Sequence, residues 1–160
     1  MESTEQPNLK PLQLVLTAMA AGLVAITVVL VIVRRTADIA IEADSKNMLF
    51  AALGLVAVGD TVVFLLARVA TLAIVRARLT RAGNEKPGSD VVWPGFWGLT
   101  IVVGGMLEGL GLLGAVVYLL TGAWIALLAP GVALFLIAVL IPTQDRFAGF
   151  VAKTTASIVR

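Results

Sequence analysis

The sequence predicts an all-α membrane protein, with four transmembrane helices in two antiparallel hairpins and a short interfacial helix at the C-terminus. Of the 160 residues, 59% are hydrophobic and 14% charged, and the mean hydropathy is +1.01. Soluble domains carry about a quarter charged residues. The charges gather at the N-terminus, at 34–46, at 76–90 and after 144, which leaves long runs almost without charge. We therefore expect residues 1–160 to form a single integral membrane domain.

Four apolar runs predict the spans, since about 20 residues cross a bilayer and roughly 17–25 is the usual range. The runs cover residues 12–33, 48–75, 96–120 and 124–141. The second is too long for the hydrocarbon and contains Arg68, so we expect its end to continue as a helix into the headgroup region. The first follows two acids rather than a basic segment, which favours a retained span over a cleaved signal. Pro130 predicts a packing kink inside the fourth, with a functional kink or a freed carbonyl that serves as an oxygen ligand as the alternatives.

The segments between the runs predict the connections. Residues 34–47 form the longer outer loop, and 121–123 (Thr-Gly-Ala) a tight hairpin. Residues 76–95 form a cytoplasmic loop that is rich in turn-forming residues from 82 to 92. Apolar residues recur at helical spacing in the tail, residues 143–160: Phe147, Phe150, Val151 and Ile158. This pattern predicts an amphipathic helix on the cytoplasmic surface, with a frayed terminus as the alternative.

The distribution of basic residues predicts the orientation, because cytoplasmic loops carry an excess of Lys and Arg. Four spans place eight basic residues on one side: Lys10, Arg76, Arg78, Arg81, Lys86, Arg146, Lys153 and Arg160. The other side holds three, Arg34, Arg35 and Lys46. Both termini are therefore expected in the cytoplasm, and the membrane is expected to be the bacterial inner membrane. The basic residues of 76–86 would meet anionic lipid headgroups, or would only set the topology.

The sequence has no cysteine and no histidine. Disulfides, thiol chemistry, zinc sites and histidine-ligated haem are excluded, so we expect no metal and no cofactor. A Ser-His-Asp arrangement cannot be built, and an enzyme is the least supported class of function. The small net charge of +2 is evidence about membrane topology rather than about nucleic-acid binding. Expected partners are membrane lipids and either further copies of the chain or other subunits of a membrane complex.

Two acids are expected near the middle of the bilayer. Glu108 and Asp60 lie about eleven and twelve residues into their runs, which enter from opposite sides. Arg68 is about 12 Å further along the helix axis than Asp60, so neither acid has a cation at its depth. An ionised acid there costs at least a few kcal/mol, and both acids should face protein or water. If they touch, they could share a proton, and Thr61 or Thr100 could donate a hydrogen bond.

Small residues surround Glu108 on its helix. Gly104, Gly111 and Ala115 share its stripe at spacings of three and four, and Gly98, Gly105 and Gly109 form the adjacent one. Together with Gly114, these glycines would let another helix approach closely, as in small-xxx-small packing. Ordinary tight packing is the simpler interpretation of the glycines taken alone.

The stretch Met106–Leu120, MLEGLGLLGAVVYLL, resembles the carboxylate-bearing helix of rotor-ring proteolipids, the c subunits of rotary ATPases. In that family an acid is followed by small and aliphatic residues and by a glycine about six positions on, as Glu108 and Gly114 are here. The resemblance implies a ring in which Glu108 binds and releases H⁺ or Na⁺. The whole chain also resembles a group of small uncharacterised four-span bacterial membrane proteins, through Leu107–Gly109 (LEG) and Pro142–Arg146 (PTxxR). That resemblance implies architecture and no activity.

Two hypotheses of function follow from these patterns. In the first, the protein is an oligomeric subunit of an ion-linked membrane assembly. Glu108 would bind H⁺ or Na⁺, and Asp60 and Thr61 could contribute to the same site. In the second, it is a structural or accessory subunit of a larger membrane complex, and the protonated acids hydrogen-bond helices together.

Overall fold

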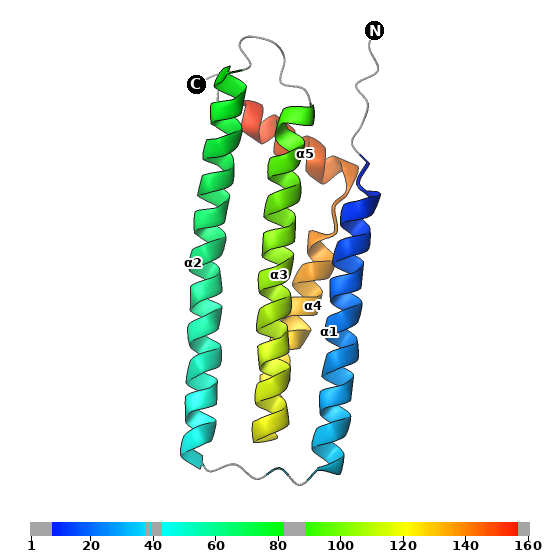
Figure 1. Cartoon of the computed structure of the whole chain (residues 1–160), viewed down its shortest axis with the longest axis vertical. Coiled ribbons are helices and arrows are strands. Elements are labelled where there is room, and N and C mark those ends of the chain that lie inside the picture. The colour runs from blue at the N-terminus through cyan, green and yellow to red at the C-terminus, as the bar shows by residue number, and fades with distance from the viewer. Residues whose placement is uncertain (1–7, 38, 40–42, 82–88, 157–160) are drawn as a thin grey trace.

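The computed structural model describes residues 8–37, 39, 43–81 and 89–156, and every regular element in these ranges is helical (Figure 1). The elements are α1 (Lys10–Thr36), α2 (Ala43–Arg81), α3 (Ser89–Thr121), a short 3₁₀ helix η1 (Trp124–Leu127), α4 (Leu128–Leu140) and α5 (Gln144–Ala156). The predicted all-α class is confirmed. The long helices stand side by side, and α5 lies across one end.

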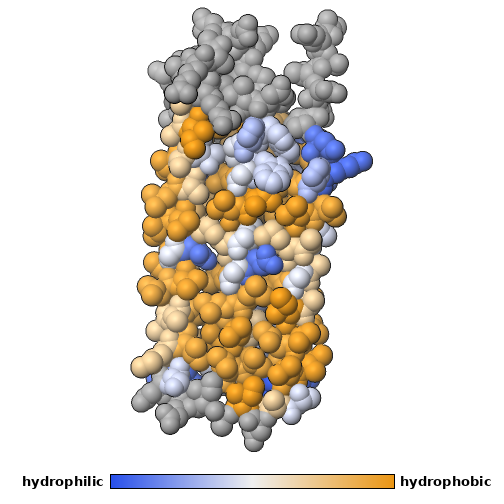
Figure 2. All heavy atoms as spheres, viewed as in Figure 1, coloured by the Kyte–Doolittle hydropathy of each residue, from blue (hydrophilic) through white to orange (hydrophobic). Residues whose placement is uncertain are grey.

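Three helices of the described residues are long and apolar enough to cross a membrane. They contribute the segments Lys10–Thr36, Ser45–Val75 and Val92–Thr121. Trp124–Leu140 and Gln144–Ala152, bent by 77°, count as a fourth span if the pair is taken as one broken helix. A broad apolar band crosses the visible face of the bundle (Figure 2). Three to four such helices indicate an integral membrane protein.

Helices α1, α3 and α4 form the packed part of the bundle. Their contact buries Leu16 and Leu23 of α1 against Ala133 and Ile137 of α4. Helix α2 stands outside this group and packs mainly on α3. None of the most apolar window of α2 is buried within the chain. The hydrophobic side chains of α2 are therefore available to lipid or to another protein.

The turn between α3 and η1 is as tight as the sequence predicts. Gly122 has a φ of +70°, which favours glycine, and its N–H donates to the carbonyl of Tyr118 at 2.8 Å. A Cβ atom added to Gly122 would lie 2.7 Å from Nη2 of Arg34. The guanidinium of Arg34 also donates to the carbonyl of Ile39. The arginine at the end of α1 therefore packs against the α3–η1 turn.

Pro130 lies near the start of α4 rather than in the interior of an α-helix. It is the third residue of α4, and the preceding turn is the 3₁₀ helix η1. The N–H groups of a first helical turn have no partner within the helix, so a proline there removes no hydrogen bond. The break in the fourth apolar run therefore comes near its start.

Helix α5 packs its apolar residues on the beginning of α3. The ring of Phe147 lies 5.5 Å from that of Trp93 and 5.3 Å from that of Phe96, both edge-to-face. Phe150 and Val151 pack against a buried pair from α2 and α3, Val75 and Val92. Helix α5 thus covers Gln144–Ala156 and is docked on the bundle, while Ile158 lies outside the described residues.

The start of α1 and the end of α4 meet at this same end of the bundle. The side-chain amide of Gln13 donates to the carbonyl of Pro142 at 2.8 Å. Figure 1 shows the beginnings of α1 and α3 beside α5. The basic residues of α5 and the start of α1 therefore share one end of the molecule.

Candidate functional site

Glu108 lies between α3 and α1. A Cβ atom added to Gly22 of α1 would be 3.8 Å from Oε1 of Glu108, and the glutamate is half-buried. Because Gly22 has no side chain, the carboxyl group occupies the space that a larger residue would fill. Gly22 is the one glycine in α1. The structure thus sets the acid of α3 against the smallest residue of its neighbour.

The α1–α3 contact is close on both sides of Glu108. A Cβ atom on Gly104 would lie 2.8 Å from Cδ2 of Leu16, and one on Gly111 would lie 2.7 Å from Cδ2 of Leu23. These glycines are one turn before and about one turn after the glutamate. They hold α1 near enough for the carboxyl group to be enclosed between two helices.

Gly114 gives α3 a similar close contact with the start of α4. A Cβ atom there would lie 2.5 Å from Cβ of Ala129 and 2.9 Å from the carbonyl oxygen of Ala126. Of the predicted helix-packing glycines, Gly104, Gly111 and Gly114 therefore lie in contacts within the chain. Gly98 and Gly109 have nothing within 4 Å, and Gly105 meets only Met19, at 3.9 Å. The face of α3 that carries Gly105 and Gly109 is open, whereas Gly98 is half-buried beside Thr71 and Val75 of α2.

Asp60 lies in a different environment. It lines an apolar groove of about 490 Å³ between α2, α3 and α4, beside Phe64 of α2, Met106 and Leu110 of α3, and Leu136 of α4. Asp60 is half-buried. Nine of the eleven residues that line the groove come from α3 and α4 or are apolar residues of α2. Asp60 therefore faces a wide apolar groove, whereas Glu108 lies in the close contact between α1 and α3.

The two carboxyl groups do not meet within the chain. Met106 and Leu110, which line the groove of Asp60, stand two positions before and after Glu108 and about 160° around α3 from it. Glu108 itself does not line the groove. The predicted common level is supported, because Asp60 lies beside the immediate neighbours of Glu108. Figure 2 shows hydrophilic patches that interrupt the apolar band at mid-height.

Within the described part of the chain, neither carboxyl group has a hydrogen-bond or ion-pair partner. Thr61 donates its hydroxyl to the carbonyl of Ala57 at 2.9 Å, so its proton is directed to its own helix rather than to Asp60. Thr100 donates likewise to Phe96, at 2.8 Å. The same residues contain no cluster of three or more acids or other metal-binding side chains.

Sequence reasoning missed two residues of α1. Gly22 was overlooked, although its mid-span position is the signal that pairs it with Glu108. Thr27 is the other: its Oγ1 is buried and has no hydrogen-bond partner among the described residues. A threonine in an apolar helix usually bonds to its own backbone, so the sequence gives no sign of this orphan hydroxyl.

The side chains of Arg76, Arg78 and Arg81 and the whole of Lys86, predicted to contact lipid headgroups, lie outside the described residues. The backbone of α2 does continue as a helix to Arg81, as predicted.

No family model, curated protein or solved structure matches the chain. What the two carboxyl groups do is inferred from the sequence and the geometry alone.

Proposed function

We propose that the protein is an integral membrane protein in which Glu108 takes up and releases a proton, as part of an oligomeric, ion-linked assembly. The observation that carries this proposal is the position of the carboxyl group: half-buried against Gly22 at the α1–α3 contact, with no cation and no hydrogen-bond partner among the described residues. An ionisable group inside a membrane is by default a functional residue, because a charge there is costly.

A proton is the ion that this environment suits best. Hard metal cations take several oxygen ligands at once. The α1–α3 contact around Glu108 is instead formed by Gly22 and by the leucine and methionine side chains that meet Gly104 and Gly111. One carboxyl group suffices for a proton, and protonation removes the charge that the apolar surroundings disfavour. Na⁺ would need further ligands from outside the described chain.

The orientation that we propose places both termini in the cytoplasm of a bacterial inner membrane. It is supported by the excess of basic residues at the end of the bundle where α1 begins and α5 packs. A cysteine in place of Gly149 should react with a membrane-impermeant maleimide only after cells are opened. Reaction in intact cells would reverse the orientation.

The oligomer that we propose would use the open face of α3. Gly105 and Gly109 are exposed and leave room for the close approach of a helix from another copy. Each of them follows a residue of the stripe that holds Glu108. The local likeness to rotor-ring proteolipids supports the same arrangement.

The test of the proton site is modification by a hydrophobic carbodiimide, which reacts with a protonated carboxyl group in apolar surroundings. Mass spectrometry of peptides should find the adduct on Glu108 in the wild type, no adduct in Glu108→Gln, and an unchanged adduct in Asp60→Asn. Modification that is as extensive in Glu108→Gln as in the wild type would sink the proposal.

A second function, a structural or accessory subunit, is favoured by one observation: Gly104, Gly111 and Gly114 serve close packing around the glutamate. In that case the protonated carboxyl would only hold helices together. Native mass spectrometry distinguishes the two. The accessory function predicts that Glu108→Gln, which can still hydrogen-bond, assembles normally while Glu108→Leu dissociates. A Gln variant that dissociates would count against it.

A further inference from the structure

The groove beside Asp60 has features that the proton site does not use. Its walls are almost entirely apolar, from Phe64 on α2 to Leu136, Val139 and Leu140 on α4, and its volume is about 490 Å³. It opens to the outside of the bundle between α2 and α4. Such a groove is long and apolar enough to hold part of an acyl chain.

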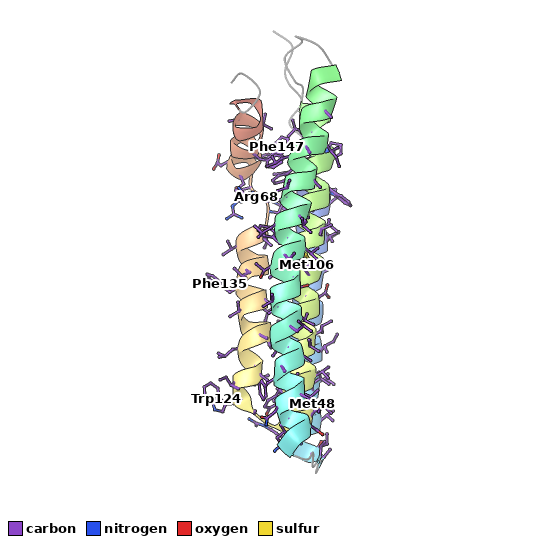
Figure 3. The ribbon with its side chains drawn as sticks, turned by 90° about the vertical axis from the view of Figure 1, so that its left-hand side faces the viewer. Met48, Arg68, Met106, Trp124, Phe135 and Phe147 are labelled. Carbon is purple, nitrogen blue, oxygen red and sulfur yellow. The ribbon has the colours of Figure 1, made fainter. Side chains whose placement is uncertain are left out.

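One arginine stands above the groove on α2. Arg68 follows Phe64 by one turn and Thr61 by two, so it shares the face of α2 that lines the groove. Figure 3 shows Arg68 on the side of α2 toward α4 and α5, close to the level at which those two helices join. Arg68 is exposed, and no ion pair or hydrogen bond engages it within the described ranges.

A second arginine reaches the same end of the groove from α5. The guanidinium of Arg146 donates to the carbonyl of Val139, a residue of the groove wall. Its backbone N–H donates to Oγ1 of Thr143 at 3.4 Å, at the start of α5. The contact with Val139 fixes the cation at the top of the α4 wall. Asp145, the neighbouring acid, is exposed and makes no ion pair with either arginine in the described part of the chain.

We infer that this groove binds an anionic phospholipid, with an acyl chain between α2 and α4 and the phosphate at Arg68 and Arg146. The depth agrees: Arg68 is about 12 Å along the helix from Asp60, against a hydrocarbon half-thickness of about 15 Å. A long arginine side chain at that depth reaches the headgroups. Basic pockets between membrane helices are suited to acidic lipid headgroups, and guanidinium pairs well with phosphate. This lipid site does not depend on proton binding by Glu108.

The experiment compares two lipids with the same acyl chains, phosphatidylglycerol and phosphatidylcholine. Purified protein in detergent is titrated with each, and bound lipid is counted by native mass spectrometry. Each arginine contributes a factor of about five, so the wild type should retain phosphatidylglycerol roughly ten- to thirty-fold better. In Arg68→Gln/Arg146→Gln this preference should fall toward one.

The matched control is Arg35→Gln/Lys46→Gln, which removes the same charge from exposed positions at the opposite end of the bundle. It should keep the wild-type preference. The proposal would be overturned if the groove variant kept its preference for phosphatidylglycerol, because other basic residues would then cause the preference. It would also be overturned if the preference fell equally in the control, because the effect would then come from general charge. Ala57→Phe keeps both arginines and fills the groove. It should lower retention of both lipids, and unchanged retention would also overturn the acyl-chain site.

Discussion

The two carboxyl groups on either side of α3 lie in different surroundings. On the α1 side, Glu108 is enclosed by a contact that three glycines, Gly22, Gly104 and Gly111, make close. On the α2 side, at the same level, Asp60 faces an apolar groove that the chain itself does not fill. The comparison shows that depth alone does not define a site. What distinguishes Glu108 is a fixed neighbour, which can hold the carboxyl group in one position.

The difference arises from the residues that α3 presents to each side. Toward α1 and α4 it presents glycine, so the helix backbones approach closely. Toward α2, at the level of Asp60, it presents Val103, Met106 and Leu110, and these larger side chains line the groove. Helix α2 is therefore the part of the bundle that is most open to lipid or to a partner.

The largest expected effect is at the packed side. In Gly114→Val, the added atoms would meet Cβ of Ala129 at 2.5 Å and the backbone oxygen of Ala126 at 2.9 Å, and neither can move freely. We expect a loss of about 1–3 kcal/mol or more in stability, measured by unfolding in detergent followed by circular dichroism. The matched control is Gly131→Val in α4, an exposed glycine with nothing within 4 Å. It should change stability by less than about 0.5 kcal/mol. Equal losses would mean that the close contact at Gly114 is not the cause of the effect.

A smaller effect is expected beside the two carboxyl groups. Alanine would fit at Gly22, since its Cβ would lie 3.8 Å from Oε1 of Glu108, but leucine would displace the carboxyl group or α1. Gly22→Leu should cost about 1–2 kcal/mol and slow carbodiimide modification of Glu108. Ala57→Leu, which extends into the groove of Asp60, should leave the stability and the rate of Glu108 modification nearly unchanged. If the two variants behave alike, the contrast between fitted contact and open groove is wrong.

Much of the fold was predictable from the sequence, because the spacing of charges sets the ends of membrane spans. The four apolar runs, the Gly122 turn and the common level of Asp60 and Glu108 all follow from counting residues along helices. The tail helix follows from its spacing of Phe147 and Phe150.

The direction in which each acid points was not predictable. In a membrane helix apolar residues lie on every side, so periodicity does not say which side faces a neighbour. The sequence therefore could not tell that Glu108 meets Gly22 while Asp60 faces a groove. The place of Pro130 near the start of α4 was not predictable for a related reason: an apolar run does not show where a 3₁₀ turn ends and an α-helix begins.

The measurement that tests the central claim most directly is the infrared absorption of protonated carboxyl groups in the reconstituted protein, recorded as the pH is changed. Reversible proton binding by Glu108 predicts a carboxyl band that grows on acidification and declines when the pH is raised again. Glu108→Gln should remove this pH-dependent band, and Asp60→Asn should retain it. A band that persists in Glu108→Gln, or a Glu108 band that does not respond to pH while the protein stays folded, would contradict the account.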